Sequence, residues 1–533
     1  MTTSDTPRAV PVGAHRVAQH VAPDALATEV AGLLDAGFRL GLVAAHDDGP
    51  TLRVVYLFLA GAPDRRVELV VTVPVEDPRV PTLAALSFPA SRFERELHDL
   101  FGIVPEGHPL PRRLIRHAHW PAGWYPMRRD AGEPPPFTET EPYPFVPVEG
   151  AGVYEIPVGP VHAGVIEPGH FRFSVVGESI LKLKARLWFT HRGVETLFVG
   201  LDARDAVHLA ERISGDSAAA HGLAHSLAVE DALGWTLPDE AHRLRALVVE
   251  LERLVNHVAD IGALANDVGF SLALAHTQRL REELLRLSAA TTGHRLLRGA
   301  IGPGRVTLRS LPDPAQLERI AADLTEIADL ALANTVIRDR FTGTAVLTRA
   351  QARDLGCLGY VARASGVGTD ARLEHPTTTL PVTVVGHPDG DVLSRFLVRR
   401  DEVVASTRLV TALIRSAGEC LSFDVSGGPH RDADDARAVD RAAEAARPRD
   451  LDGAGAAVPS AQVRSGVGIV EGWRGTVVHR VEVDDAGLLT RAKVVDPSWF
   501  NWPGLPIAMV DTIVPDFPVA NKSFNLSYAG NDL

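Results

Sequence analysis

Three ionisable side chains between residues 191 and 230 could carry chemistry. Glu195 ends the sequence Arg-Gly-Val-Glu, and Asp216 and His221 follow it along the chain. A buried carboxylate with a raised pKa can pass protons, so these groups either line a polar channel or form a satisfied buried network. A metal ion held by His221 with Asp216 or Asp496 is a third alternative, with a ligand set weaker than most metal sites have.

Helices are predicted to position these groups. Read as one helix, residues 191–230 carry a stripe at three-and-four spacing, made of Ser214, Ser217, His221 and Ala228. Further apolar stripes predict a long helix capped by Asp239 and helices over 272–290, 313–334 and 401–417. Strands over 171–176 and 180–189 precede the bundle. The Ala-rich stretch 432–457 is predicted to begin as an exposed helix and end as a loop.

Length and composition limit the classes of function. The chain has 533 residues, enough for more than one domain. A net charge of -13 argues against nucleic-acid binding. The two cysteines, Cys357 and Cys420, cannot hold an iron–sulfur cluster alone. No long uncharged apolar run is present, so no transmembrane segment of its own is expected. No phosphate-binding Gly-rich loop is present either.

A small mixed unit is predicted before a Pro-rich linker. Residues 1–20 read as a flexible lead-in, and Asp24 is predicted to cap a helix that ends near residue 35. Strands and a short helix are then predicted over 38–45, 52–59, 67–74 and 90–100. The expected fold class is α+β. A small α/β-mixed domain (1–130) precedes a linker (131–150) and a mainly helical bundle with β additions at its edges (151–533).

The first domain carries an ordered set of charged and Pro-rich motifs. It reads Glu-Arg-Glu-Leu-His-Asp-Leu-Phe-Gly-Ile over 94–103, with Gly-His-Pro over 107–109 and Pro-Met-Arg-Arg-Asp over 126–130. This order resembles the signature of the C subunit of NADH–quinone oxidoreductase, respiratory complex I. The resemblance implies a segment that packs between subunits.

The second domain resembles nickel–iron hydrogenase large subunits without their metal ligands. In that family, the positions of Ser214 and Ser217 are cysteines, and so are two in the C-terminal motif that here reads Asp-Pro-Ser-Trp-Phe-Asn. Ser498 and Asn501 occupy those last two positions. Soft thiolates suit nickel–iron chemistry, whereas hydroxyl and amide groups do not. The resemblance therefore implies no nickel–iron centre and no bound metal. The matching hydrogenase Glu passes protons, which makes Glu195 and His221 the candidate catalytic residues of a vestigial motif.

The same domain is also similar to the cysteine-free D subunit of complex I. C-like residues before the linker and D-like residues after it resemble the fused large subunits of formate hydrogenlyase-type, energy-converting hydrogenases and their cysteine-free relatives. In the D subunit a His and a Tyr reach the quinone head group. His170 is the possible quinone-binding match, whereas no Tyr lies between Tyr154 and Tyr360. His170 could instead hydrogen-bond a turn.

These resemblances imply a peripheral subunit on the cytoplasmic face of a membrane-bound oxidoreductase complex. The expected partners are an iron–sulfur small subunit, which would hold the cluster, and antiporter-like membrane subunits. NADH would be handled by another subunit. The chain would then line a cavity for quinone or another electron acceptor. The alternative is a non-catalytic scaffold that kept only the fold and the interfaces. The space between Ser214, Ser217, Ser498 and Asn501 distinguishes these two functions: side chains that fill it favour the scaffold, and an open polar cavity favours a redox role.

Overall fold

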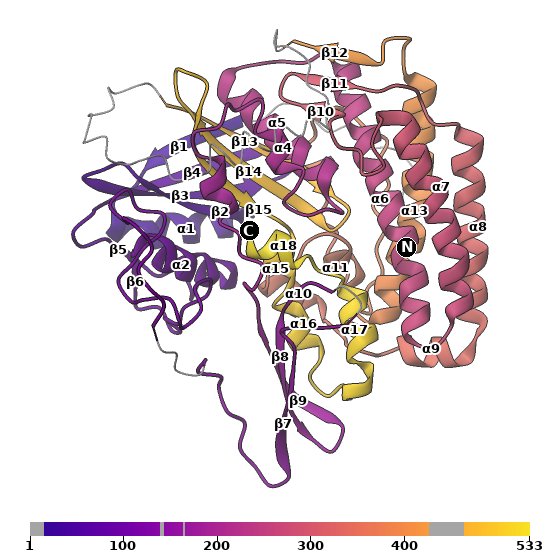
Figure 1. The fold of residues 1–533 in the computed structure, drawn as a ribbon, viewed down its shortest axis with the longest axis horizontal. Helices are drawn as coiled ribbons and strands as arrows, with labels where there is room; N and C mark the ends of the chain where they lie inside the picture. Colours follow the sequence, from indigo (N-terminus) through magenta and orange to yellow (C-terminus); the bar gives the residue numbers. More distant parts are fainter. Residues whose placement is uncertain (1–14, 139–142, 164–165, 426–462) are drawn as a thin grey trace.

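The computed structural model describes residues 15–138, 143–163, 166–425 and 463–533. Figure 1 shows a helix bundle at one end, a small sheet domain at the other, and strands between them. Helices and strands mix throughout, which confirms the predicted α+β class. In the part of the chain that is described, no helix combines the length and apolar character needed to cross a membrane. Residues 432–457 lie outside the described residues.

The N-terminal sheet has the strand order β1-β4-β3-β2. Its strands are β1 (His15–His20), β2 (Arg39–Asp47), β3 (Thr51–Ala60) and β4 (Arg65–Pro74). Helices α1 (Leu26–Asp35) and α2 (Phe88–Phe101) complete the unit, so the predicted strands and both predicted helices are confirmed. The lead-in was predicted wrongly at its end, because β1 pairs in parallel with the open edge of β4. Asp24 lies in a 3-10 turn and caps nothing with its side chain.

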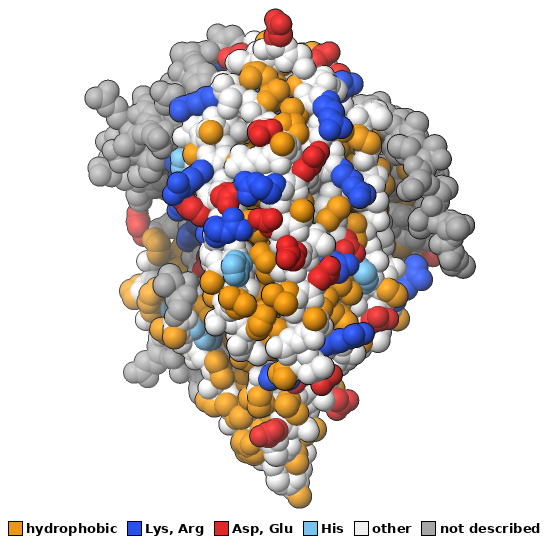
Figure 2. Space-filling model, turned by 90° about the vertical axis from the view of Figure 1, so that its right-hand side faces the viewer, with side chains coloured by type: hydrophobic (Ala, Val, Ile, Leu, Met, Phe, Trp, Pro, Cys, Tyr) orange, Lys and Arg blue, Asp and Glu red, His pale blue; other side chains and the backbone are white. Residues whose placement is uncertain are grey.

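A three-stranded sheet projects from the body of the molecule. It consists of β7 (Val153–Val158), β8 (His170–Val176) and β9 (Ser179–Arg186), and it confirms the two predicted strands. Figure 1 places this sheet below the body, and Figure 2 shows hydrophobic side chains over the narrow lower end. Tyr154, Val176 and Leu181 on this sheet are 50%, 41% and 39% exposed. The projection therefore presents apolar surface.

Four long helices form the bundle. They are α6 (Asp239–Asp267), α7 (Ser271–Thr292), α8 (Pro314–Ala333) and α13 (Val392–Ser416). All four were predicted, although α13 begins earlier than expected because Asp391 caps it by accepting a hydrogen bond from Ser394 N. Asp313 caps α8 in the same way, through Ala315 N. Asp239 does not cap α6, because Pro238 occupies the cap position and Asp239 lies in the first turn.

The centre of the molecule is a sheet that the sequence did not predict. Strands β13 (Arg464–Gly472), β14 (Gly475–Val483) and β15 (Leu489–Val495) are antiparallel neighbours. Every residue of β14 is buried, including Arg480 and Glu482, so burial does not alternate along this strand. Helix α5 (Ala218–Leu233) packs on β13 and β14. The predicted β additions at the edges of the bundle are therefore joined by a core sheet.

The motif helix is shorter than predicted. Residues 191–217 form two short helices and loops, and the long helix begins only after Ser217. Gly193 and Gly200 adopt left-handed backbone conformations (φ 66° and 84°), which interrupt a helix. Ser214 and Ser217 therefore lie on the loop before α5, not on its stripe with His221.

Short elements connect these layers. They are η1 (Pro23–Ala25), β5 (Arg79–Pro81), β6 (Val104–Glu106), α3 (Val194–Phe198), α4 (Val207–Ala210), β10 (Ile301–Gly302), β11 (Arg305–Thr307), α9 (Thr335–Phe341), α10 (Arg349–Asp354), α11 (Gly359–Ala364), α12 (Ala371–Glu374), β12 (Ser422–Asp424), α15 (Ser498–Asn501), α16 (Gly504–Ala508), η2 (Val514–Asp516), α17 (Phe517–Phe524) and α18 (Tyr528–Asp532). The predicted domain boundaries at 130 and 150 stay a prediction.

Gly468 allows α5 to lie directly on β13. A Cβ at this position would lie 1.9 Å from the carbonyl oxygen of Ala224 and 2.8 Å from the nitrogen of Ala228. We expect Gly468→Ala to lower the free energy of unfolding by about 2 kcal/mol, since overpacking forces backbone atoms apart. Urea denaturation measures this loss. Gly368→Ala is the control, because a Cβ there meets open space and the free energy of unfolding is expected to change little. Gly487→Ala would not serve, because the φ of Gly487 is 80°, a backbone conformation that strains alanine.

A buried histidine joins the N-terminal sheet to β14. The Arg480 guanidinium donates to His46 Nε2 over 3.2 Å, while His46 Nδ1 lies 3.3 Å from a Glu482 oxygen. These roles suit a neutral imidazole. Burial lowers the pKa of His46 from 6.5 to about 4, although Glu482 opposes the shift.

This histidine makes stability sensitive to acid. Between about pH 6.5 and pH 4 the unfolded chain binds a proton at His46 that the folded chain does not, so the free energy of unfolding falls as pH falls. His46→Gln should flatten that part of the curve, measured by denaturant titration at a series of pH values. His20→Gln, at an exposed position, is the matched control. Equal slopes for His46→Gln and the parent chain would contradict this assignment.

Candidate functional site

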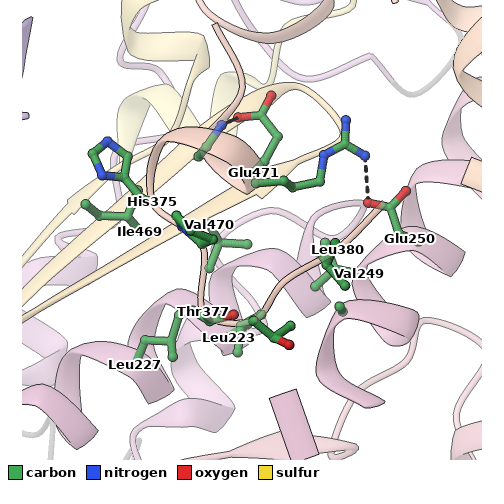
Figure 3. Close-up of a pocket in the computed structure, with 15 residues that line it drawn as sticks. Leu223, Leu227, Val249, Glu250, His375, Thr377, Leu380, Ile469, Val470 and Glu471 are labelled. Atoms are coloured by element: carbon green, nitrogen blue, oxygen red, sulfur yellow. Dashed lines mark hydrogen bonds and ion pairs between the residues drawn. The ribbon is translucent and has the colours of Figure 1, made fainter. Parts of the chain in front are cut away.

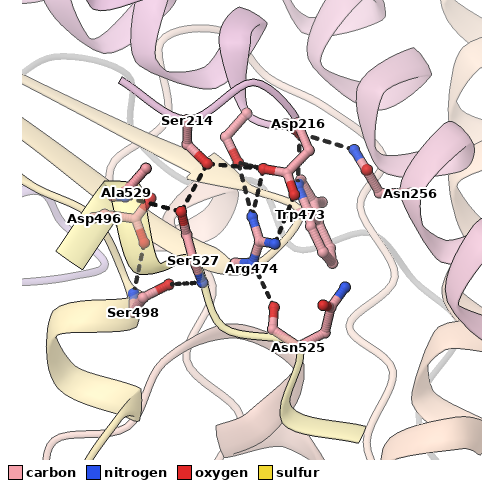
Figure 4. A network of polar contacts seen from close by, with 12 residues as sticks. Ser214, Asp216, Asn256, Trp473, Arg474, Asp496, Ser498, Asn525, Ser527 and Ala529 are labelled. Carbon is pink, nitrogen blue, oxygen red and sulfur yellow. Dashed lines mark hydrogen bonds and ion pairs between the residues drawn. The ribbon is translucent and has the colours of Figure 1, made fainter. Parts of the chain in front are cut away.

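The two vestigial motifs meet through a third serine. Ser214 Oγ lies 2.8 Å from Ser527 Oγ, and the Ser527 backbone nitrogen donates to Ser498 Oγ over 2.9 Å. These serines are at most 4% exposed. Figure 4 shows the Ser214 and Ser527 side chains pointing toward each other and the Ser498 side chain pointing toward the Ser527 main chain. Direct contacts therefore connect the loop before α5 with α15.

A carboxylate–guanidinium pair fills the next part of the site. Arg474 donates to both oxygens of Asp216, over 2.6 and 2.7 Å, and Asp216 also accepts from Ser214 (2.8 Å) and Ser217 (3.3 Å). Burial alone would raise the pKa of Asp216, but Arg474 and the two serines hold it at about 2. Asp216 is therefore ionised and bound to Arg474 at neutral pH.

The fourth position is also occupied. The Asn501 amide accepts from Leu358 N over 2.8 Å and donates to Leu358 O over 3.1 Å. Its side chain is fully buried. Both ends of the amide therefore bind the main chain of one residue, and all four former ligand positions have partners within the protein.

Removing the charge of Asp216 tests how much this pair contributes. Asp216→Asn leaves the Arg474 guanidinium, whose side chain is 4% exposed, without its carboxylate. A fully buried pair would cost about 3 to 5 kcal/mol to break, but the Asp216 side chain is 39% exposed and water screens part of the charge. We therefore expect a loss of about 2 kcal/mol in urea denaturation. Ser217→Ala, which removes two longer hydrogen bonds, to Asp216 (3.3 Å) and from Arg474 (3.4 Å), should cost about 1 kcal/mol.

His221 binds a different carboxylate. Its Nε2 lies 3.1 Å from an Asp496 oxygen, and its Nδ1 lies 3.0 Å from His479 Nε2. All three side chains are at most 1% exposed. Asp216 is held by Arg474 in a separate set of contacts. Within the described residues, no group of three or more His, Cys, Asp or Glu side chains is placed to hold a metal ion.

Glu195 is paired with cations. Its carboxylate lies 2.8 Å from Arg491 Nη1 and 3.1 Å from Lys493 Nζ, and it accepts from Val494 N over 3.1 Å. Burial would raise the pKa of Glu195, but Lys493 and Arg491 outweigh it and lower the pKa to about 2. Proton passage was expected to need a raised pKa, so the observed shift is in the opposite direction. These contacts fit the satisfied-network alternative.

One carboxyl group with a raised pKa lies beside the site at a position that the sequence motifs did not indicate. Glu252 on α6 accepts from Ala219 N (2.6 Å) and Ala220 N (3.1 Å) at the start of α5. Burial raises the pKa of Glu252 to about 8, and these hydrogen bonds oppose the shift. Glu252 lies one helical turn after Val248, which belongs to the apolar stripe of α6. A carboxylate on this predicted buried face could have identified Glu252 from the sequence.

His170 lies at the start of β8, in the projecting sheet. Its Nδ1 lies 3.1 Å from the carbonyl oxygen of Gly159, as the turn-binding alternative predicts. Its Nε2 is buried and has no hydrogen-bond partner among the described residues. Tyr528 packs against the neighbouring Gly169, where a Cβ would lie 2.5 Å from the Tyr528 ring. This tyrosine comes from the far end of the chain, outside the stretch in which the family resemblance placed one.

A small pocket lies beside Glu471. It has a volume of about 50 Å³ between α5, α6, α12 and β13, which is room for a few water molecules. Figure 3 shows Leu223, Leu227 and Val249 along one side, with Glu471 and Glu250 on the other. This pocket is too small for a quinone ring.

Family models match three parts of the chain. Residues 19–135 match the 30 Kd subunit of respiratory-chain NADH dehydrogenase, and residues 267–532 match its 49 Kd subunit. Residues 192–264, which contain the loop of Ser214 and Ser217, match the nickel-dependent hydrogenase model. The matches place C-like sequence before the predicted linker and hydrogenase-like and D-like sequence after it, as the motifs indicated.

Curated relatives cover most of the chain. Hydrogenase-4 component G of Escherichia coli K12 is 29% identical over 82% of this chain and 73% of its own length. Formate hydrogenlyase subunit 5 of the same organism is 28% identical over 87% and 78%. The C/D subunit of NADH-quinone oxidoreductase from Phocaeicola vulgatus is 30% identical over 64% and 71%.

A solved structure has the same fold. It is a chain of the archaeal membrane-bound sulfane sulfur reductase complex, 22% identical, with a TM-score of 0.58, and the match covers 73% of this chain and all of that one. The sequence relatives establish the family as well as the fold. Their identity and coverage, together with the matched C-like and D-like segments, show that this chain belongs to the family of fused complex I-type C/D subunits shared by NADH-quinone oxidoreductases and formate hydrogenlyase-related hydrogenases.

Proposed function

We propose that this chain is the C/D-type subunit of a membrane-bound, complex-I-like oxidoreductase and that it holds no nickel–iron centre. The observation that carries the proposal is the bridge from Ser214 through Ser527 to Ser498. A metal centre between the two motifs would need four thiolates facing a common space. Here hydroxyl and amide groups stand at those positions and bind protein atoms.

The same contacts favour a structural role for the vestigial site. The scaffold alternative requires side chains between the four former ligand positions, and Ser527, Asp216 and Arg474 supply them. Glu195 adds no free carboxylate, because two cations bind it. In this proposal the chain contributes shape and interfaces, and an iron–sulfur small subunit on the cytoplasmic side carries the electrons.

The projecting sheet is evidence for the proposed contact with membrane subunits. Exposed apolar side chains gather on β7, β8 and β9, which extend away from the body of the molecule. Contiguous exposed apolar surface marks interaction sites. We therefore assign this sheet to contact with the antiporter-like subunits.

A quinone site is the second candidate function. It is favoured by one observation, the buried Nε2 of His170 that lacks a hydrogen-bond partner among the described residues. Nδ1–H donates to the Gly159 carbonyl, so Nε2 carries a proton only in the imidazolium form, and in that form it could donate to a quinone carbonyl. His170→Ala should then abolish quinone reduction by the purified complex, whereas His162→Ala, on the neighbouring loop, serves as the control.

The proposal is tested by purifying the complex through a tag on this chain from membranes in a mild detergent. Subunits and metals are measured on the same sample, with an untagged strain as the control. We expect an iron–sulfur small subunit and antiporter-like subunits, with iron present and nickel at the level of the control. Stoichiometric nickel would overturn the metal assignment. Recovery of this chain alone would overturn the assignment to a complex.

A further inference from the structure

A pocket of about 530 Å³ lies at a seam between distant parts of the chain. One wall comes from α1, β2 and residues 84–89, which lead into α2, and the other comes from α10 and Phe500. Pockets that bind drug-sized molecules have volumes of about 300–1,000 Å³ and often lie between domains. This volume is within that range and is about ten times that of the pocket beside Glu471.

The lining is mainly apolar. Leu34, Phe38, Leu40 and Phe500 contribute to the walls. Two further lining residues, Leu86 and Phe88, are 42% and 41% exposed. Exposed side chains of this size beside a concave apolar surface gain about 25 cal/mol for each Å² that a ligand covers.

Two guanidinium groups line the same pocket. The nearest carboxylate to Arg39 is Glu374, at 3.9 Å, which is beyond hydrogen-bond distance, and Arg39 Nη2 has no hydrogen-bond partner among the described residues. The Arg353 side chain has neither a hydrogen bond nor an ion pair within the described chain. One carboxylate, Asp354, also lines the pocket. The Glu374 carboxylate beside Arg39 is not part of the lining, and Arg353 is the lining cation without an ion-pair partner within the described chain.

We propose that this pocket binds a small amphiphile with an anionic head group, either a carboxylate or a phosphate. Arg39 and Arg353 pair with the head group, since guanidinium groups form charge-assisted hydrogen bonds with both anions. The apolar tail lies against Phe38, Phe88 and Phe500. A pocket of this volume suits one small molecule better than an extended peptide.

Binding of decanoate to the purified full-length chain tests the proposal. Isothermal titration calorimetry is run with decanoate, with decyl phosphate, with acetate as the head group alone, and with decanol as the tail alone. We expect saturable binding of one decanoate or decyl phosphate per chain and no binding of acetate, with decanol at least tenfold weaker. Comparing the two anions shows which head group the pocket prefers.

Variants locate the site. Arg353 is exposed, and Arg353→Gln should raise the Kd for the preferred anion at least fivefold. Arg39→Gln should raise this Kd more than Arg353→Gln does. Arg338→Gln on α9, also exposed, is the matched control and should leave the Kd unchanged. Circular dichroism verifies that each variant is folded. Absence of saturable binding, equal affinity for decanol, or an unchanged Kd in both arginine variants would each overturn the proposal.

Discussion

Replacing Lys493 by methionine is expected to lower the free energy of unfolding by about 3 to 5 kcal/mol. Lys493 is 2% exposed, and its ammonium group lies 2.6 Å from Glu96 and 3.1 Å from Glu195. Removing one member of a buried charge pair is costly because the other charge stays buried without a partner. Arg491 still compensates Glu195, so most of the loss falls on Glu96.

Controls separate charge from packing in this prediction. Lys182→Met, at an exposed position of β9, should change stability by less than about 0.5 kcal/mol. Adding Glu96→Gln to Lys493→Met should restore much of the loss, because no buried carboxylate then lacks a cation. Urea denaturation at pH 7 measures all four proteins. If the double variant is no more stable than the single one, the loss arises from packing against Phe93 and Trp499 instead.

Lys493 also connects segments that resemble two different families. Glu96 lies in the C-like signature on α2, whereas Glu195 follows the hydrogenase-like Arg-Gly motif and Lys493 lies on β15. One ammonium group therefore connects residues from both parts of the fused chain. Glu195, the candidate for proton passage, lies between two cations at this junction.

The sequence predicted elements with clear periodicity and missed the centre. Apolar runs between turn residues located β2 to β4, although β2 and β3 are buried on both faces, and helical spacing of apolar residues located the four bundle helices. β14 is buried along its whole length and has no such pattern. The motif helix was predicted too long because Ser214 and Ser217 fit its spacing. In the structure Gly193 and Gly200 adopt left-handed conformations, which interrupt the helix before α5.

The candidate site was predicted in part. The four former ligand positions were located from local motifs, since each motif spans only a few residues. Their partners could not be located in this way. Arg474 is 258 residues from Asp216, and Ser527 is 313 residues from Ser214. Such pairs depend on the core sheet and on the C-terminal helices, which local patterns did not place.

Replacing Arg363 by methionine should also cost about 3 to 5 kcal/mol. Arg363 is 1% exposed and donates to Glu402 and to Glu471, both over 2.8 Å. Burial and the neighbouring Asp370 carboxylate already raise the pKa of Glu471. Without Arg363, the carboxyl groups of Glu402 and Glu471 lose their shared cation in the core.

The pH dependence of this loss identifies its cause. In Arg363→Met the pKa of Glu471 in the folded chain should rise further above its unfolded value, whereas Glu402 keeps His257 at 2.7 Å and Arg253 at 3.5 Å. The folded variant then binds more protons than the unfolded chain, so its stability falls as pH rises. We therefore expect the difference from the parent chain to be smaller at pH 5 than at pH 7. Arg363→Lys, which keeps the charge but not the two-pronged geometry, should lose less. A difference that is independent of pH would mean that Arg363 stabilises the core by packing on its neighbours and not by neutralising the two carboxylates.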